Sequence, residues 1–462
     1  MIVMKFGGTS VGTLEAMRQA ADIVFAKREK HPIVVTSAMS GATDELLKLA
    51  RLAASGSSGE AASRFDALKK KHYEAVPASF EAREKVIAEL DAIFLELKQV
   101  LSGLILLREL TARSLDLIAS CGERMAAPIL AAYVSSVGVS AAAIDSRDGI
   151  ITDDSYTSAE VDFTKTNERL RALILPLLRA NIIPVVTGFI ARSHDGATTT
   201  LGRGGSDYTA AILGAALGAE EIQIWTDVDG ILSADPKIVP NAKILSEVSY
   251  AEAIEMSYFG AKVIHPKTML PAFGAGIPII IKNTFRPNSS GTRISKNAYG
   301  NGKGVKVVTA ISKVSLITVS GLGLRGRVGF AAAVFEVASR ERANIIMITQ
   351  ASSEQSICMI VDRADGLRLK AALERAFANE IKMKSVEGAI LDENVSIVSV
   401  VGAGMAGTPG IAGKTFSAAA GAGVNILAIA QGSSELNISF AVAASDAEAA
   451  VKAIHNAFIC PV

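Results

Sequence analysis

The sequence contains few of the residues that build disulfide or metal frameworks. Only three cysteines occur in 462 residues, and Cys121, Cys358 and Cys460 lie far apart without CxxC spacing. This spacing argues against both a disulfide framework and a zinc site, and it fits a reducing cytoplasm. The five histidines are scattered without metal-ligand spacing. We therefore predict no metal site built by the protein itself.

Excess charge and long apolar runs are also scarce. The formal net charge is +1, so nothing indicates a nucleic acid or a membrane surface as a partner. No stretch approaches the roughly 18 consecutive apolar residues of a membrane span. The start of the chain, MIVMKFGG, places a lysine and two glycines where a signal peptide would be apolar. These absences predict a cytoplasmic protein.

Apolar runs alternate with helical patterns through the first two-thirds of the chain. A helix is expected over Thr13 to Arg28, and the Ala-, Leu-, Glu- and Lys-rich stretch from 60 to 135 predicts further helices. This alternation predicts a parallel or mixed sheet covered on both faces, with substrates at the carboxyl ends of its strands. The expected strands are Ile2 to Phe6, Pro32 to Ser37, Ile182 to Gly188, Glu221 to Thr226 and Pro278 to Lys282.

The last third contains an internal repeat. The stretch Ser295 to Gly304, rich in turn and breaker residues, predicts a domain boundary at that place, ahead of the repeat. The segment that starts at Val319 aligns without a gap with the one that starts at Val400, an offset of 400 − 319 = 81 residues. Each copy follows the order strand, Gly-rich turn, helix, strand, turn, strand. Because this period is too long for a solenoid, we predict two small α+β domains packed on one another.

The first motif that carries chemistry is KFGGTSVG, Lys5 to Gly12. Its glycines let backbone N–H groups approach phosphate oxygens, and the helix that follows adds partial positive charge. The lysine precedes the glycines, so this is not the Walker pattern. Taken alone, the motif could also be a tight turn with a surface lysine.

The second motif is TTTLGRGGSDYTA, Thr198 to Ala210. Arg203 suits bidentate recognition of a carboxylate, and the glycines and serine after it offer N–H donors at a helix start. Asp207 can orient a lysine, or it can simply cap the helix.

Two shorter motifs follow. WTDVDG, Trp225 to Gly230, ends a strand and would be an Asx turn if it stood alone. YFGAKVIHP, Tyr258 to Pro266, contains Lys262, which in isolation would be a surface charge.

Together these motifs resemble the amino-acid kinase superfamily, and specifically its aspartate kinases. KFGGTS, SAM near Ser37, GER around Glu123, GRGGSD, TDV and FGAKVIHP occur in the family's order. The tandem repeat resembles the paired ACT domains of the regulated members. The resemblance covers essentially the whole chain. It implies a three-layer α/β kinase sandwich with a mostly parallel sheet at 1–298, followed by α+β ACT domains at 305–391 and 392–462.

The resemblance also implies an activity and a set of site residues. ATP with Mg²⁺ would phosphorylate the β-carboxylate of L-aspartate to give 4-phospho-L-aspartate, the first step of lysine, threonine and methionine biosynthesis. The catalytic positions are Lys5 and Asp207. The aspartate-binding positions are Ser37, Thr43, Glu123, Arg203, Gly204, Gly205 and Ser206. The nucleotide-binding positions are Lys5, Phe6, Gly7, Gly8, Ser10, Thr226, Asp227, Leu232, Lys237, Lys262 and Val263.

The charges of aspartate give a physical reason for part of this assignment. Glu123 can pair with the ammonium and Arg203 with the α-carboxylate, which leaves the β-carboxylate facing the γ-phosphate. Without the resemblance, Glu123 would be read as a surface glutamate on a helix. Two positions depart from the family pattern, because Leu232 replaces a common tyrosine and Lys237 a common arginine. Both put nucleotide affinity and base preference in doubt, but not the reaction.

The ACT resemblance implies feedback by a small amino acid and a homo-oligomer assembled through the repeats. The candidate effector-binding residues are Asn344, Gln350, Asn425 and Gln431, at matched strand-edge positions of the two copies. These side chains could instead close turns. The sequence motifs ITQ and SSE resemble those of threonine-sensitive members more than those of lysine-sensitive members, which favours threonine as the effector.

Two rival interpretations stay open from sequence. Other superfamily kinases act on glutamate, N-acetylglutamate or nucleoside monophosphates, but they generally lack the tandem repeat and the GER motif. A non-catalytic amino-acid sensor would not need a set of charged residues, which here are Lys5, Arg203, Asp207 and Lys262. A fusion with homoserine dehydrogenase is not expected, since the chain ends at Val462 directly after the second repeat.

Overall fold

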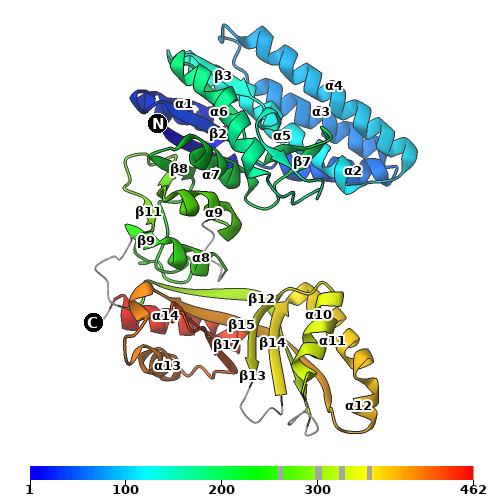
Figure 1. Cartoon of the computed structure of the whole chain (residues 1–462), viewed down its shortest axis with the longest axis vertical. Helices are drawn as coiled ribbons and strands as arrows, with labels where there is room; N and C mark the ends of the chain where they lie inside the picture. Colours follow the sequence, from blue (N-terminus) through cyan, green and yellow to red (C-terminus); the bar gives the residue numbers. More distant parts are fainter. Residues whose placement is uncertain (259–263, 297–303, 322–327, 351–355, 461–462) are drawn as a thin grey trace. The chain divides into compact units, whose positions relative to one another are not determined.

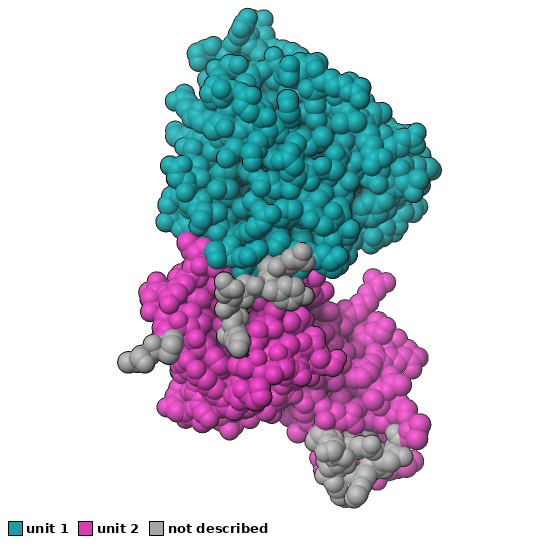
Figure 2. Space-filling model, turned by 60° about the vertical axis from the view of Figure 1, so that its left-hand side comes forward, with its two compact units in different colours: residues 1–231, 246–250, 263–298 teal, residues 232–245, 251–262, 299–462 magenta. Residues whose placement is uncertain are grey.

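The computed structural model describes residues 1–258, 264–296, 304–321, 328–350 and 356–460. The chain divides into two compact units, which Figure 2 colours separately. The first unit holds residues 1–231, 246–250 and the described part of 263–298. The second holds residues 232–245, most of the helix at 250–258 and the described chain from residue 304 onward. Each unit builds its own main sheet (Figure 1).

An eight-stranded sheet forms the centre of the first unit, in the order β3-β5-β2-β1-β8-β10-β11-β9. The strands from β3 to β10 are parallel, and β11 is antiparallel to β10. The bounds are β1 Ile2–Phe6, β2 Pro32–Thr36, β3 Ala141–Ile144, β5 Ile183–Thr187, β8 Glu221–Thr226, β9 Glu247–Ser249, β10 Ile279–Asn283 and β11 Thr292–Ser295. The five strands expected from apolar runs are confirmed to within one residue at each end. A smaller sheet joins β4 Ile151–Thr152, β6 Ile190–Ser193 and β7 Thr198–Thr200.

Helices cover both faces of the large sheet. Side chains alternate along β1, so Met4 and Phe6 pack into the core with α1 and α5, whereas Lys5 points to the opposite face and reaches α7. Behind α5 lie the helices α2, α3 and α4, and α6 and α9 pack beside α7. The three-layer sandwich is therefore confirmed. The bounds are α1 Leu14–Ala26, α2 Ala42–Ala54, α3 Ser58–Glu74, α4 Arg83–Leu107, α5 Ala112–Ser136, α6 Phe163–Arg179, α7 Gly205–Leu217 and α9 Pro266–Ala275.

Local chemistry explains where two of these helices start. Thr13 caps α1, because its Oγ1 accepts a hydrogen bond from the Ala16 N–H at 3.2 Å. Thr111 caps α5 in the same way through the Ser114 N–H at 3.1 Å. Among the described helices, α5 alone meets the length and mean hydropathy of a membrane span, and 89% of that stretch is buried inside the protein. It is a core helix of the first unit.

The second unit is an antiparallel six-stranded sheet in the order β13-β14-β12-β15-β17-β16. Its strands are β12 Val307–Ser320, β13 Ile345–Gln350, β14 Ser356–Asp362, β15 Gly388–Val401, β16 Ala428–Gln431 and β17 Asn437–Ala443. Its helices are α8 Tyr250–Tyr258, which begins in the first unit, α10 Phe330–Arg340, α11 Arg363–Ala376, α12 Ala378–Lys382, α13 Ile411–Gly421 and α14 Ala447–Phe458. The strand, helix, strand, strand order expected for both repeats is confirmed.

The two repeats share their longest strands. The first part of β12, Val307–Ile311, pairs with the last part of β15, Ile397–Val401, while the second part of β12 pairs with the first part of β15. The predicted division between residues 391 and 392 lies within β15, and the domain boundaries stay a prediction. The core of the second repeat also contains Ala234 and Val239 from the segment 232–245.

Candidate active site

A cavity of about 1010 Å³ opens at the carboxyl ends of the first unit's strands. Gly7, Ser37 and Thr226, at or just after the ends of β1, β2 and β8, lie in its wall. Open α/β sheets bind their ligands at this edge. The predicted residues that line it are Lys5, Gly7, Gly8, Ser37, Thr43, Glu123, Arg203, Gly204, Gly205, Ser206, Asp207 and Thr226.

Lys5 and Asp207 form an ion pair in this cavity. Lys5 Nζ lies 2.6 Å from Asp207 Oδ1, and the two side chains are only 11% and 16% exposed. The strand β1 delivers the lysine, and the first turn of α7 carries the aspartate. Because little solvent screens the pair, the electrostatic attraction between the two charges is stronger than it would be at an open surface. The contact implied by the resemblance is present, whereas the catalytic roles stay predictions.

Glu123 presents a buried carboxyl group to the same cavity. It lies on α5, is 3% exposed, and its Oε2 has no hydrogen-bond partner among the described residues. Burial raises the pKa of Glu123 to about 8, although the Ala38 backbone and Lys5 act in the opposite direction. The alternative of a surface glutamate is therefore wrong. A buried carboxyl with an unused acceptor suits a cationic group of a ligand.

The GRGGSD segment turns sharply before α7. Gly204, the N-cap of α7, has φ +73°, a left-handed conformation that glycine adopts without strain. The turn places the first N–H groups of α7 at the cavity, where they carry partial positive charge. Arg203 stands exposed in the wall beside them. This corner of the cavity can therefore bind an anion such as a carboxylate.

Several predicted residues do not line the cavity. The Ser10 hydroxyl is buried against the sheet, 2.7 Å from Thr284 Oγ1 and 3.2 Å from the Trp225 carbonyl oxygen. Its neighbour Thr9 lines the cavity instead. Phe6 stacks on Trp225 in the core. Asp227 does not line the cavity. Leu232 and Lys237 belong to the second unit. Lys262 and Val263 lie outside the described residues.

The sequence interpretation missed Asp116, which lines the cavity from α5. It stands seven residues before Glu123, which is two helical turns and therefore the same helix face. That spacing was the only available signal, because the partners of Asp116 lie far away in the chain. They are the Thr157 N–H and both the N–H and hydroxyl of Thr200.

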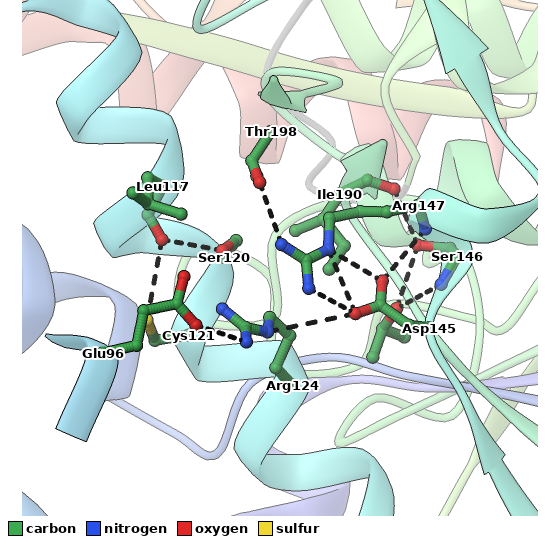
Figure 3. Close-up of polar contacts among 11 residues, drawn as sticks. Glu96, Leu117, Ser120, Cys121, Arg124, Asp145, Ser146, Arg147, Ile190 and Thr198 are labelled. Carbon is green, nitrogen blue, oxygen red and sulfur yellow. Dashed lines mark hydrogen bonds and ion pairs between the residues drawn. The ribbon is translucent and has the colours of Figure 1, made fainter. Parts of the chain in front are cut away.

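A second polar cluster surrounds Arg124 on α5 (Figure 3). Arg124 Nη2 donates to Glu96 Oε2 at 2.6 Å, and its Nε lies 3.9 Å from Asp145 Oδ2. Asp145 accepts from Arg147, whose Nη1 donates to Thr198 Oγ1 at 2.9 Å. These contacts tie α4 and α5 to β7, the strand that precedes the GRGGSD segment.

A smaller cavity of about 310 Å³ lies in the second unit. Of the four predicted effector residues, Gln431 lines it, while Asn344, Gln350 and Asn425 do not. The turn around Gly407 and the start of α13 form most of the remaining wall. Glu435 closes one side and accepts a hydrogen bond from the Gly407 N–H at 2.6 Å.

Comparison with known proteins agrees with this architecture. The model of the amino acid kinase family matches residues 1–283, and that of the ACT domain matches residues 317–377 and 398–458. The chain therefore belongs to the amino acid kinase family.

Individual relatives narrow this assignment to the aspartokinases. Aspartokinase 1 of Arabidopsis thaliana, a chloroplastic protein, is 33% identical over 99% of this chain and 80% of its own length. The bifunctional aspartokinase/homoserine dehydrogenase of Haemophilus influenzae is 37% identical over 99% of this chain and 56% of its own length. The chain thus spans about half the length of the bifunctional relatives it matches. Aspartokinase III of E. coli, solved with aspartate and ADP, has a TM-score of 0.81 at 30% identity and 99% coverage of both chains.

Proposed function

We propose that this chain is an aspartate kinase, which transfers the γ-phosphate of ATP to the β-carboxylate of L-aspartate and forms 4-phospho-L-aspartate. One observation carries the proposal. A single cavity contains the Lys5–Asp207 pair, the buried carboxyl of Glu123 and the exposed guanidinium of Arg203. The E. coli relative of the same fold was solved with aspartate and ADP, which supports the same ligands here.

The charges in the cavity match the charges of aspartate. Glu123 would bind the ammonium, while Arg203 and the N–H groups at the start of α7 would bind the α-carboxylate. The β-carboxylate then remains free toward Lys5. Since this carboxylate is already ionised at neutral pH, it attacks phosphorus without a general base. The protein's task is to align two anions and to stabilise the charge on the transferring group.

Lys5 would stabilise the phosphoryl oxygens during transfer, and Asp207 would hold the lysine in place. The backbone at Gly7 and Gly8 lies in the wall next to Lys5 and would contact the phosphates of ATP. Thr226, at the end of β8, would contact the nucleotide from the other side of Lys5. We keep Phe6, Ser10, Asp227, Leu232, Lys237, Lys262 and Val263 as nucleotide-binding candidates from the resemblance alone.

Mg²⁺ belongs to the proposal as the ion that accompanies ATP. Among the described residues, no group of three or more His, Cys, Asp or Glu side chains could hold a metal. At the cavity, Asp116 is occupied by three hydrogen bonds and Asp207 by Lys5. Phosphate oxygens and water would supply most of the ligands of the ion. When bound, it neutralises negative charge on the phosphates.

Regulation by an amino acid is the second part of the proposal. The cavity beside Gln431 combines an amide and the Thr408 hydroxyl with the apolar side chains of Met405, Ile411 and Ile438. This mixture suits a short side chain with one hydroxyl and one methyl group, which supports threonine over lysine. An E. coli relative was solved with lysine and aspartate, so an amino-acid effector has a structural precedent. Inhibition curves with threonine and lysine, repeated with Gln431→Ala, test this part. Stronger inhibition by lysine would reverse the preference.

The organisation of the chain and its setting are part of the same proposal. We assign catalysis to residues 1–298 and regulation to ACT domains at 305–391 and 392–462, in line with the ranges that the family models match. We further propose a homo-oligomer formed through the ACT domains, a place at the first step of lysine, threonine and methionine biosynthesis, and a reducing cytoplasmic setting for the free thiols.

A substrate panel tests the catalytic proposal. ADP release is measured with ATP and Mg²⁺ plus aspartate, glutamate, N-acetylglutamate or uridine monophosphate. We expect release with aspartate and at most a few per cent of that rate with the other acceptors. Faster release with another acceptor would move the chain to a different kinase class. A folded sample that releases no ADP but binds threonine would support the sensor alternative.

A further inference from the structure

The strand β7, Thr198–Thr200, consists of three threonines, and each hydroxyl has a different partner. Thr198 Oγ1 accepts from Arg147 at 2.9 Å. Thr199 Oγ1 lies 2.7 Å from Thr152 Oγ1, and Thr200 Oγ1 donates to Asp116 Oδ1 at 2.8 Å. The three partners sit on different elements. β7 is therefore held from several sides directly before the GRGGSD segment.

Asp116 does more than bind one hydroxyl. Its Oδ2 also accepts the backbone N–H groups of Thr157 and Thr200, both at 2.9 Å. The residue is 2% exposed although it lies at the cavity wall. Because backbone N–H groups only donate, Oδ2 must act as the acceptor. One buried carboxylate thus joins two segments that are 200 − 157 = 43 residues apart in the chain.

One of these segments holds a strained residue. Thr157 has φ +72°, a conformation that is costly for a β-branched side chain. Its N–H bond to Asp116 helps to keep it there. The carbonyl oxygen of Thr157 lies 3.2 Å from where a side-chain carbon on Gly202 would stand, so this loop packs directly against the residue before Arg203.

The other segment leads into the same place. Thr200 lies three residues before Arg203, and its carbonyl oxygen accepts the Ala159 N–H at 2.9 Å. Asp116 therefore fixes both segments that pack around Gly202, the loop at Thr157 and the strand end at Thr200. It also stands on the same face of α5 as Glu123, so one rigid helix carries the group that would bind the ammonium and the anchor of the group that would bind the α-carboxylate.

We propose that Asp116 is a positioning residue, which holds the Gly202–Arg203 turn at a fixed distance from Glu123 and thereby sets the affinity for the α-amino and α-carboxyl groups of the substrate. The proposal rests on the proposed aspartate kinase function. Asp116 would not contact the reacting atoms. Its loss should therefore weaken aspartate binding far more than it slows phosphoryl transfer.

Two neighbouring substitutions test this with a matched control. Thr200→Val removes the hydroxyl bond to Asp116 and keeps the shape of the side chain. Thr199→Val removes the equally buried bond to Thr152 from the same strand. We expect Thr200→Val to raise the aspartate KM about tenfold, with the ATP KM and kcat within about twofold. Thr199→Val should leave all three within about twofold while lowering the melting temperature to a similar extent.

Asp116→Ala provides a stronger perturbation. Alanine keeps no acceptor for the buried N–H groups of Thr157 and Thr200, so we expect the aspartate KM to rise on the order of a hundredfold. An unchanged aspartate KM in Thr200→Val, or equal rises in both threonine variants, would overturn the positioning role. Wild-type protein without aspartate-dependent ADP release would overturn the proposed function itself, and the positioning role with it.

Discussion

Replacing Glu123 by glutamine should change how aspartate use depends on pH. The pKa of Glu123 is raised by burial to about 8, so at pH 7 only about a tenth of the free protein carries the charge that would bind the substrate ammonium. The wild-type kcat/KM for aspartate should therefore rise close to tenfold from pH 7 to pH 8.5. Glu123→Gln has no charge to gain, and its profile should be flat over this range.

The size of the effect follows from the burial of the site. A hydrogen bond to a charged group contributes about 1.5–3 kcal/mol, or about 10- to 150-fold. At pH 8.5 the kcat/KM of Glu123→Gln should therefore lie roughly 10- to 150-fold below that of the wild type. At pH 7 this difference should be about tenfold smaller, because most of the wild-type protein is then uncharged at Glu123. The assay measures initial rates at aspartate concentrations far below KM, with the exposed Glu168→Gln as the control. A flat wild-type profile, or a glutamine variant with the wild-type slope, would refute the role of Glu123.

The same pKa shift has a consequence for stability. The folded-state pKa of Glu123 lies above its ordinary value of 4.5, so the unliganded fold binds this proton more tightly than the unfolded chain. Stability from this group is present below pH 4.5 and declines as the pH rises toward 8. Glu123→Gln avoids that decline, and its melting temperature should exceed that of the wild type increasingly from pH 5 to pH 8.

Three further predictions follow from other contacts. Lys5→Ala should lower kcat by about 10²–10³-fold with the fold intact, because it removes the charge that would stabilise the phosphoryl oxygens during transfer; near-normal turnover would take Lys5 out of the mechanism. Arg203→Ala should raise the aspartate KM by about 10- to 100-fold and the ATP KM by less than about threefold, with Arg203→Lys in between; equal effects on both substrates would contradict its role. Lys306→Met should lower the free energy of unfolding by about 3 kcal/mol in urea, because Glu252, which is 0% exposed, loses the ammonium at 2.8 Å. The exposed pair Lys452–Glu448 is the control, and Lys452→Met should cost less than about 1 kcal/mol.

Periodicity located the framework of the catalytic unit because its strands are buried on both faces. Every residue of β1 and β2 is buried, and apart from Lys5 and Thr36 both strands read as apolar runs. The ends of these strands then placed Lys5 and Ser37 at one edge of the sheet. For these two strands, the apolar pattern of the sequence is enough to predict where the residues at their ends lie in the fold.

Side-chain direction in the phosphate turn was not predictable from the motif. Thr9 and Ser10 both carry hydroxyls directly after the two glycines, and only the 3₁₀ turn at Gly8–Val11 decides which one faces the cavity. Ser10 points to Thr284, which follows β10 and is far away in sequence. A motif specifies residue types, but a partner 274 positions distant fixes the orientation.

Long-range contacts also explain why Asp116 and the segment 232–245 were missed. An aspartate inside an amphipathic helix looks like a solvated position until Thr157 and Thr200 are brought to it. The segment 232–245 precedes β9 in the chain, yet Ala234 and Val239 are buried with strands that begin more than sixty residues later. Neither its composition nor its spacing indicates that association.

The most direct test of the central claim is to trap the acyl phosphate. Protein, ATP, Mg²⁺ and L-aspartate are incubated with hydroxylamine, and the product is identified by mass spectrometry, with Lys5→Ala run in parallel. We predict the β-hydroxamate of aspartate, dependent on ATP and nearly absent with Lys5→Ala. A folded wild-type sample that forms no hydroxamate from aspartate, or forms more from glutamate, would contradict the account.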